Sequence, residues 1–314
     1  MPDLRVMFMG TPSFALPALQ MLHVENYQIT GVITQPDRPQ GRGQVTNPTA
    51  VKILAQKFGL PVYQPNSIKE QAFFELAKEL NPEIIVVAAF GQILPKLILD
   101  IPRLGCLNIH PSLLPKYRGA APINWTLIKG ETKAGVTIMM MDEGMDSGAI
   151  LEQEETFVDP SENYGHLHDR LARHGAILLM KVIGNILTGT AQPHPQDSSL
   201  ATFAPRLTKE IGEINWHNSV IDICNLIRGL SPSPAAYSFI EGKLLKIYAA
   251  EPKPETTGKM PGSLGESLVN GIAITASDGY VILKEVQLAG KKKMTANEFL
   301  RGYKLNPNNI LGKK

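Results

Sequence analysis

The chain has 314 residues, 43% of them hydrophobic, and a formal net charge of +2. This length allows two domains, at least one of them with a sizeable core. The small net charge predicts by itself no polyanionic partner, and the two cysteines, Cys106 and Cys224, lie too far apart in the sequence to suggest a disulfide framework or a metal motif. The beginning of the sequence has no signal-peptide pattern, and no apolar run approaches the roughly 18 residues that span a bilayer. We therefore expect a cytoplasmic protein that does not associate with membranes.

Strands and helices alternate through the first 189 residues. Short apolar runs, such as IIVVAAF at 84–90, are typical of strands buried on both faces. The expected strands are 4–9, 29–34, 84–90, 104–110, 136–141 and 150–157, and the expected helices are 14–24, 50–58, 69–80, 123–129 and 162–187. This alternation predicts an α/β fold with a Rossmann-like, mostly parallel sheet.

The segment 190–205, TAQPHPQDSSLATFAP, has three prolines and little periodicity, which predicts a linker. Beyond it we expect a helix at 219–230 and strands at 236–240, 244–249, 271–276 and 279–287, many of them joined by glycine turns. This pattern favours a small β-barrel of the OB type. The predicted domains are thus 1–189 and 206–314, joined by the linker.

The charge is distributed unevenly between the two parts. Residues 206–314 contain 15 Lys and Arg against 10 Asp and Glu, a balance of +5, whereas residues 1–205 contain 16 against 19, a balance of −3. An acidic catalytic part beside a basic binding part is one interpretation. A loop at 35–49, QPDRPQGRGQVTNPT, is unusually long for an α/β domain, and such loops are usually functional or disordered.

Several common sites can be excluded from their motifs. The turn after the first predicted strand, MGTPSFA, lacks the G-x-G-x-x-G spacing of dinucleotide-binding folds, and no G-x-x-x-x-G-K-[ST] occurs. A nicotinamide enzyme is therefore not expected. There is also no H-E-x-x-H, and His166, His168 and Asp169 fall on a predicted helix where positions i and i+2 diverge. We expect no metal site.

Asn108 and His110 lie two positions apart at the carboxyl end of a predicted strand, so their side chains leave the same face. Open α/β sheets bind ligands at this end of their strands. An amide beside an imidazole is suited to stabilising the oxyanion that forms when a carbonyl becomes tetrahedral, and the imidazole can also move protons near neutral pH. The pair predicts carbonyl chemistry.

The sequence NIHPSLLPKYRGAAP, which begins at Asn108, resembles the signature of the 10-formyltetrahydrofolate-dependent formyltransferases. The resemblance implies that Asn108 and His110 are catalytic, and that a third catalytic group is an Asp in a loop of type D-x-G-x-I. On physical grounds Asp142, Glu143 and Asp146 all remain candidates for that role, and the register of MDSGAI at 145–150 selects Asp146.

The resemblance also implies binding residues and a type of acceptor. It extends over nearly the whole chain and is closest to the family members that formylate initiator methionyl-tRNA, because of the PDRPQGRG loop and the basic C-terminal part, which those members use to bind tRNA. A monomer is expected. The implied folate-binding residues are Phe90, Gln92, Ile93, Leu94, Ser112, Leu113, Leu114, Pro115 and Asp142. The implied tRNA-binding residues are Arg38, Arg42, Lys243, Lys246, Lys291, Lys292, Lys293, Arg301 and Lys304.

Three alternatives remain open at this point. An amino-sugar nucleotide formyltransferase would use the same chemistry with another acceptor, although the Arg-Gly loop and the basic C-terminal part argue against it. A hydrolase of the formylfolate would use water in place of the amine. A non-enzymatic RNA-binding protein would leave Asn108, His110 and Asp146 without a role.

Overall fold

The computed structural model describes residues 4–40, 45–265, 271–306 and 308–312. The chain divides into two compact units. The N-terminal unit comprises Met1–Pro122, Lys133–Thr156 and His168–Ala204, and the C-terminal unit comprises Ile123–Thr132, Phe157–Leu167 and Pro205–Lys314. None of the helices within the described residues is both long and apolar enough to cross a membrane.

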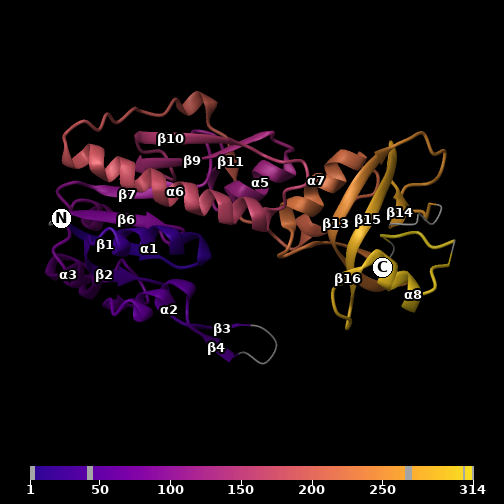
Figure 1. The fold of residues 1–314 in the computed structure, drawn as a ribbon, viewed down its shortest axis with the longest axis horizontal. Coiled ribbons are helices and arrows are strands. Elements are labelled where there is room, and N and C mark those ends of the chain that lie inside the picture. The colour runs from indigo at the N-terminus through magenta and orange to yellow at the C-terminus, as the bar shows by residue number, and fades with distance from the viewer. Residues whose placement is uncertain (1–3, 41–44, 266–270, 307, 313–314) are drawn as a thin grey trace. The chain divides into compact units, whose positions relative to one another are not determined.

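A seven-stranded sheet with the order β10-β9-β7-β6-β1-β2-β5 forms the centre of the N-terminal unit (Figure 1). The pairs β1–β2, β1–β6, β2–β5 and β6–β7 are parallel, whereas β7 and β9 are antiparallel. The strands are β1 (Arg5–Gly10), β2 (Gln28–Ile33), β5 (Val62–Tyr63), β6 (Ile84–Ala88), β7 (Cys106–His110), β9 (Lys133–Met140) and β10 (Ile150–Phe157). The predicted α/β class with a mostly parallel sheet is therefore confirmed.

The five helices predicted within residues 1–189 begin and end close to their predicted positions, and a short helix at Lys96–Leu99 was not predicted. Pro17 lies in the first turn of α1, where its missing N–H breaks no helical hydrogen bond. Thr49 caps α2, because its side-chain oxygen accepts the backbone N–H of Lys52. The bounds are η1 (Ser13–Ala15), α1 (Leu16–Val24), α2 (Ala50–Lys57), α3 (Gln71–Glu79), α4 (Lys96–Leu99), α5 (Pro122–Ile128) and α6 (Tyr164–Leu187).

Strand β7 has two different faces. Ile109 packs on the side of α6, where Gly175 lies so close that an added Cβ would sit 2.6 Å from the Ile109 Cγ2. Because side chains alternate along a strand, Asn108 and His110 point to the opposite face. Helix α6 thus covers one side of β7, and the other side is left for the loops that carry polar groups.

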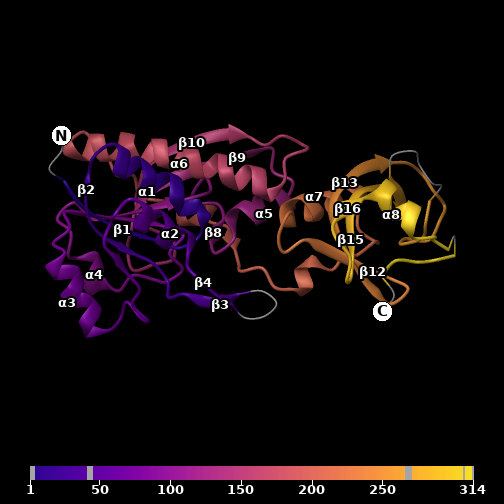
Figure 2. The same cartoon turned by 60° about the horizontal axis from the view of Figure 1, so that its bottom comes forward.

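The long loop at 35–49 contains a short hairpin of β3 (Arg38–Gln40) and β4 (Val45–Asn47), which extends from the N-terminal unit (Figure 2). Its base is held by Asp37, which accepts hydrogen bonds from Lys52 and from Gln64. Arg42, one of the residues implied for tRNA, lies outside the described residues.

The segment predicted as a linker makes many contacts with the N-terminal unit. Its strand β11 (Phe203–Ala204) pairs in parallel with β8 (Arg118–Gly119), and His194 forms an isolated bridge with Ile150. Between these two attachments lies the short 3-10 helix η2 (Ser198–Leu200). A strand of two residues carries no periodicity, so neither β8 nor β11 could be predicted from the sequence.

The C-terminal unit is built on a five-stranded antiparallel sheet with the order β12-β13-β15-β14, in which β16 also pairs with β15. Its core includes Trp216, Ile227 of α7 and Phe299 of α8. Among the described pairings, none joins the ends of this sheet, so an OB-type barrel stays a prediction. The bounds are η3 (Glu210–Gly212), α7 (Val220–Leu230), β12 (Ala236–Ile240), β13 (Lys243–Pro254), β14 (Ile272–Thr275), β15 (Gly279–Leu288), β16 (Met294–Thr295) and α8 (Ala296–Gly302).

The β8–β11 pair requires glycine at position 119. Gly119 has a φ of 119°, and an added Cβ would lie 2.9 Å from the Ala204 carbonyl oxygen. We expect Gly119→Ala to lower the free energy of unfolding by about 1–3 kcal/mol, because both the conformation and the close approach penalise a side chain. The measurement is the midpoint of thermal unfolding. Gly184→Ala is the control, since Gly184 lies in α6 with open space around it and should gain stability. A Gly119→Ala variant as stable as wild type would contradict this account.

Candidate active site

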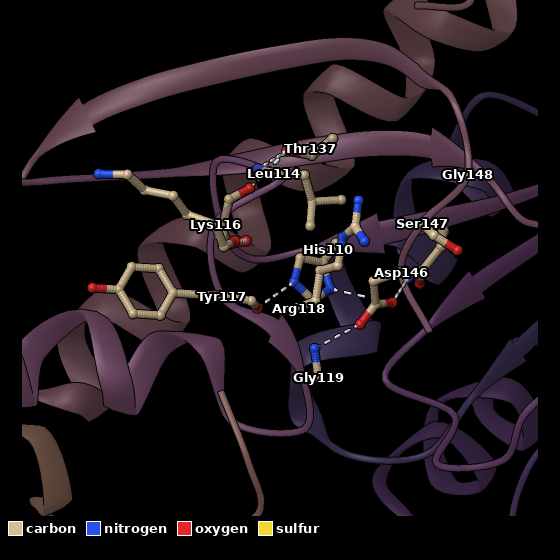
Figure 3. A network of polar contacts seen from close by, with 12 residues as sticks. His110, Leu114, Lys116, Tyr117, Arg118, Gly119, Thr137, Asp146, Ser147 and Gly148 are labelled. Carbon is tan, nitrogen blue, oxygen red and sulfur yellow. Dashed lines mark hydrogen bonds and ion pairs between the residues drawn. The ribbon is translucent and has the colours of Figure 1, made fainter. Parts of the chain in front are cut away.

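Asn108 and His110 end strand β7 as predicted, and the loop between β9 and β10 folds over their face of the sheet (Figure 3). That loop brings Asp146 to both side chains. The Asn108 Nδ2 donates to Asp146 Oδ1 at 3.3 Å, and His110 Nδ1 lies 3.6 Å from the same oxygen. The three residues that the sequence and the resemblance selected are therefore in contact, although Asp146 lies 36 positions beyond His110.

Asp146 is fixed in a conformation that favours glycine, since its φ is 51°. Its second carboxylate oxygen, Oδ2, accepts the backbone N–H of Gly119 at 2.8 Å. One oxygen is thus anchored on the backbone of β8, while the other faces the amide and the imidazole. A carboxylate anchored in this way keeps its direction without relying on the two groups that it orients.

His110 is 4% exposed, and its Nε2 lies 3.0 Å from the Tyr117 carbonyl oxygen. A carbonyl only accepts hydrogen bonds, so Nε2 carries a proton and Nδ1, which faces Asp146, is the atom that can gain one. Burial lowers the pKa of His110 below its ordinary value of 6.5, against the opposing effects of the Asp146 charge and the Tyr117 carbonyl. At neutral pH the imidazole is therefore uncharged, with a basic nitrogen directed at a carboxylate.

The geometry distinguishes between the three acidic residues of the loop. Asp142 is exposed and accepts hydrogen bonds from the Ser147 hydroxyl and the Gly144 backbone, which stabilise the turn. Glu143 is exposed on the same turn. Of these acidic residues, Asp146 is the one for which the described contacts reach Asn108 and His110.

Three further residues belong to this arrangement, and sequence reasoning gave none of them a role. Tyr117 offers its carbonyl to His110, and Gly119 offers its amide to Asp146. Gln196 donates from Nε2 to the backbone carbonyls of Asp146 and Gly148, both at 2.8 Å. Two of these contributions come from backbone atoms, for which the residue type gives no signal, and Gln196 falls in the segment predicted as a linker.

The residues implied for folate lie in three neighbouring loops of the N-terminal unit. The loop after β6 is close to the loop after β9, because Met141 packs against the cluster that holds Phe90 and Leu94. The side chains of Phe90, Leu94, Ser112 and Leu114 are buried, those of Gln92, Leu113 and Pro115 are half-buried, and those of Ile93 and Asp142 are exposed.

The basic residues implied for tRNA fall into two places. Arg38 is exposed on β3 of the N-terminal unit. In the C-terminal unit the turn after β15 lies beside the start of β13, since the Ala289 amide donates to the Leu244 carbonyl, and Lys243 lies over the ring of Tyr303 at the end of α8. These contacts place Lys243 near the turn that carries Lys291, Lys292 and Lys293, whereas Lys246 donates to the Pro234 carbonyl at 3.0 Å. Arg301 and Lys304 are exposed at the end of α8 and just after it. Lys293 is neutralised in part by Glu285 at 2.6 Å.

Within the part of the chain that the structure describes, no group of three or more His, Cys, Asp or Glu side chains is arranged to hold a metal ion. His168 packs edge-on against Phe14 and pairs with Asp169 at 2.8 Å. These contacts are those of a helix side chain at the surface of a core.

Two family models match the chain, one described as formyl transferase over residues 4–183 and one as formyl transferase, C-terminal domain, over residues 206–304. A methionyl-tRNA formyltransferase from Syntrophus aciditrophicus is 52% identical over 312 residues, which cover 99% of this chain and 100% of the relative. One from Geotalea uraniireducens is 48% identical and is covered completely, as is this chain.

Solved structures share the fold at lower identity. A crystal structure of an N-formyltransferase from Helicobacter canadensis, in complex with folinic acid and dTDP-3-aminofucose, superposes with a TM-score of 0.68 at 21% identity, over 93% of this chain and 100% of that one. The family models and the full-length relatives lead to one conclusion: the chain belongs to the formyl transferase family and, within it, to the group of the methionyl-tRNA formyltransferases.

Proposed function

We propose that this protein transfers the formyl group of 10-formyltetrahydrofolate to the free α-amino group of initiator methionyl-tRNA. The observation that carries the proposal is the contact of Asn108, His110 and Asp146 at the end of β7. Full-length relatives that are 42–52% identical and are named methionyl-tRNA formyltransferase support the acceptor.

Asn108 provides hydrogen-bond donors for a carbonyl oxygen that takes up negative charge under attack. Its amide carries two N–H groups, and the 3.3 Å contact with Asp146 uses one of them. The other can be directed to the reacting oxygen. A donor fixed in this way acts mainly in the transition state, since the charge on that oxygen is largest there.

His110 and Asp146 handle the proton. The attacking amine loses a proton and the departing nitrogen gains one, so a single base that accepts and then returns the proton balances the reaction. The neutral His110 can accept at Nδ1, and the resulting cation then lies 3.6 Å from the Asp146 carboxylate. Burial alone makes that cation unfavourable, and the Asp146 charge offsets part of this cost.

The three neighbouring loops fit a folate. When bound there, 10-formyltetrahydrofolate supplies the formyl carbon. The ring system of a folate has flat faces that can pack on apolar side chains and an edge of hydrogen-bonding groups. The loops offer exposed Ile93 and Met145 beside backbone and polar groups such as Gln92 and Asp142. The buried side chains of Phe90, Leu94 and Leu114 would support these loops from beneath.

The basic residues would bind the tRNA backbone. The cations of the C-terminal unit, together with Arg38 and Arg42 of the loop at 35–49, suit a polyanion whose binding depends on salt concentration. We infer a catalytic domain at 1–189, a linker at 190–205 and an OB-like tRNA-binding domain at 206–314. We also infer a monomer in the cytoplasm, where aminoacylated tRNA is used.

Removal of the Asn108 amide tests its catalytic role. We expect Asn108→Ala to fold normally and to lower kcat by about 10²–10³, the usual loss for one oxyanion donor. Formyl transfer to methionyl-tRNA under saturating folate is the measurement, with thermal unfolding as the check on folding. Asn218→Ala, at an exposed position of the C-terminal unit, should leave kcat unchanged. Turnover close to wild type in Asn108→Ala would rule out this role.

A direct comparison of acceptors tests the proposed function. With 10-formyltetrahydrofolate as donor, the protein should formylate charged initiator methionyl-tRNA and neither uncharged tRNA nor an amino-sugar nucleotide. Formate released without any acceptor would indicate hydrolysis instead. Transfer to the sugar nucleotide with none to methionyl-tRNA would overturn the proposed acceptor while leaving the chemistry intact.

A further inference from the structure

The side-chain amide of Gln196 uses all of its hydrogen-bonding groups at the candidate active site. Its Nε2 donates to the carbonyl oxygens of Asp146 and Gly148, both at 2.8 Å. Its Oε1 accepts from Arg118 at 3.1 Å from Nε and 2.7 Å from Nη2. An amide has two donors and two acceptor lone pairs, so these four contacts saturate it and fix its orientation.

The two carbonyls that Gln196 holds belong to a strained turn, one to Asp146 itself and one to Gly148. Asp146 has a φ of 51°, a conformation that costs a non-glycine residue free energy and persists only where its surroundings enforce it. An added Cβ on Gly148 would lie 1.8 Å from the Met140 carbonyl oxygen, so the turn is also tightly packed there. Gln196 therefore contacts the backbone that sets the direction of the Asp146 side chain.

Arg118 connects Gln196 to the segment that contacts His110. It stands between Tyr117, whose carbonyl holds His110, and Gly119, whose amide holds the Asp146 carboxylate. Arg118 is 7% exposed, and its guanidinium meets Gln196 through two N–H groups, a paired geometry that Lys could not reproduce. The three consecutive residues 117–119 thus fix His110 and Asp146 relative to each other. Arg118 contributes to this by holding Gln196.

The segment that carries Gln196 is itself anchored on both sides. His194 and Ile150 exchange two backbone hydrogen bonds of 2.8 Å, and the Arg118 amide donates to the Thr202 carbonyl at 2.8 Å. Gln196 lies between these attachments, so its backbone is held against the same loops that its side chain contacts.

We propose that Gln196 is a positioning residue for formyl transfer, which holds the Asp146 turn through its amide N–H groups and thereby sets the contact of Asp146 with Asn108 and His110. Gln196 touches none of the reacting atoms and acts through Asp146. The inference rests on the proposed function, and it gives the segment 190–205 a part in the chemistry besides its part as a connection.

Gln196→Glu is the sharpest variant, because it keeps the size of the side chain and its contact with Arg118 but has no N–H for the two carbonyls. We expect Gln196→Glu and Gln196→Ala to lower kcat by roughly 10²-fold, the typical cost of a misplaced catalytic group. The affinity for tetrahydrofolate and the KM for methionyl-tRNA should not change. Gln192→Ala is the matched control, since Gln192 is an exposed glutamine of the same segment, and it should behave as wild type.

A double-mutant cycle with Asp146→Asn separates positioning from general damage. If Gln196 acts through Asp146, adding Gln196→Glu to Asp146→Asn should lower kcat little further. Fully additive losses, or wild-type kcat in Gln196→Glu, would overturn the inference.

If neither Gln196 variant folded, Arg118→Lys would serve as the test, because it leaves Gln196 in place and removes the paired contact that orients the Gln196 amide. Wild-type kcat in that variant would overturn the inference as well. Failure of the proposed function is distinguishable, because the wild-type protein would then transfer no formyl group.

Discussion

The carboxylate of Asp146 lies between a backbone amide and two polar side chains, and the rest of the candidate site depends on this position. Oδ2 takes the Gly119 N–H at 2.8 Å, and Oδ1 meets Asn108 at 3.3 Å and His110 at 3.6 Å. The short contact to the backbone makes the anchor, and the two longer contacts leave room for the side chains to turn to a substrate. Because the fold holds this anion, it can stabilise the His110 cation against the effect of burial. Its position does not depend on His110.

The fold provides this position by bringing together segments that are far apart in the chain. Strand β7 presents Asn108 and His110, while β11 pairs with β8 and holds the Gly119 amide in place. That pairing requires a residue without a side chain, because the Ala204 carbonyl lies where a Cβ would be. The segment predicted as a linker thus contributes to the N-terminal unit before the chain enters the C-terminal one.

The parts of this account that follow from sequence are those that depend on local pattern. Buried runs such as Ile84–Ala88 predict the mostly parallel sheet, and alternation along a strand places Asn108 and His110 on one face. Asp146 needed the family resemblance, since Asp142 lies in the same loop with the same charge. Gln196 was beyond prediction, because its partners are 48 positions away or more and its own segment has no periodicity. Contacts between distant loops leave no local pattern in a single sequence.

Burial and the Asp146 charge shift the pKa of His110 in opposite directions, and an NMR titration of the His110 imidazole measures their balance. We expect a pKa below 6.5 in the wild-type protein, because burial outweighs the carboxylate. We expect a still lower pKa of His110 in Asp146→Asn, which keeps the shape of the side chain but removes the charge that raises the pKa. The His110 signal can be assigned by its loss in His110→Gln. A pKa at or above 6.5 in the wild-type protein, or one that does not fall in Asp146→Asn, would show that burial and the Asp146 charge do not oppose each other at His110.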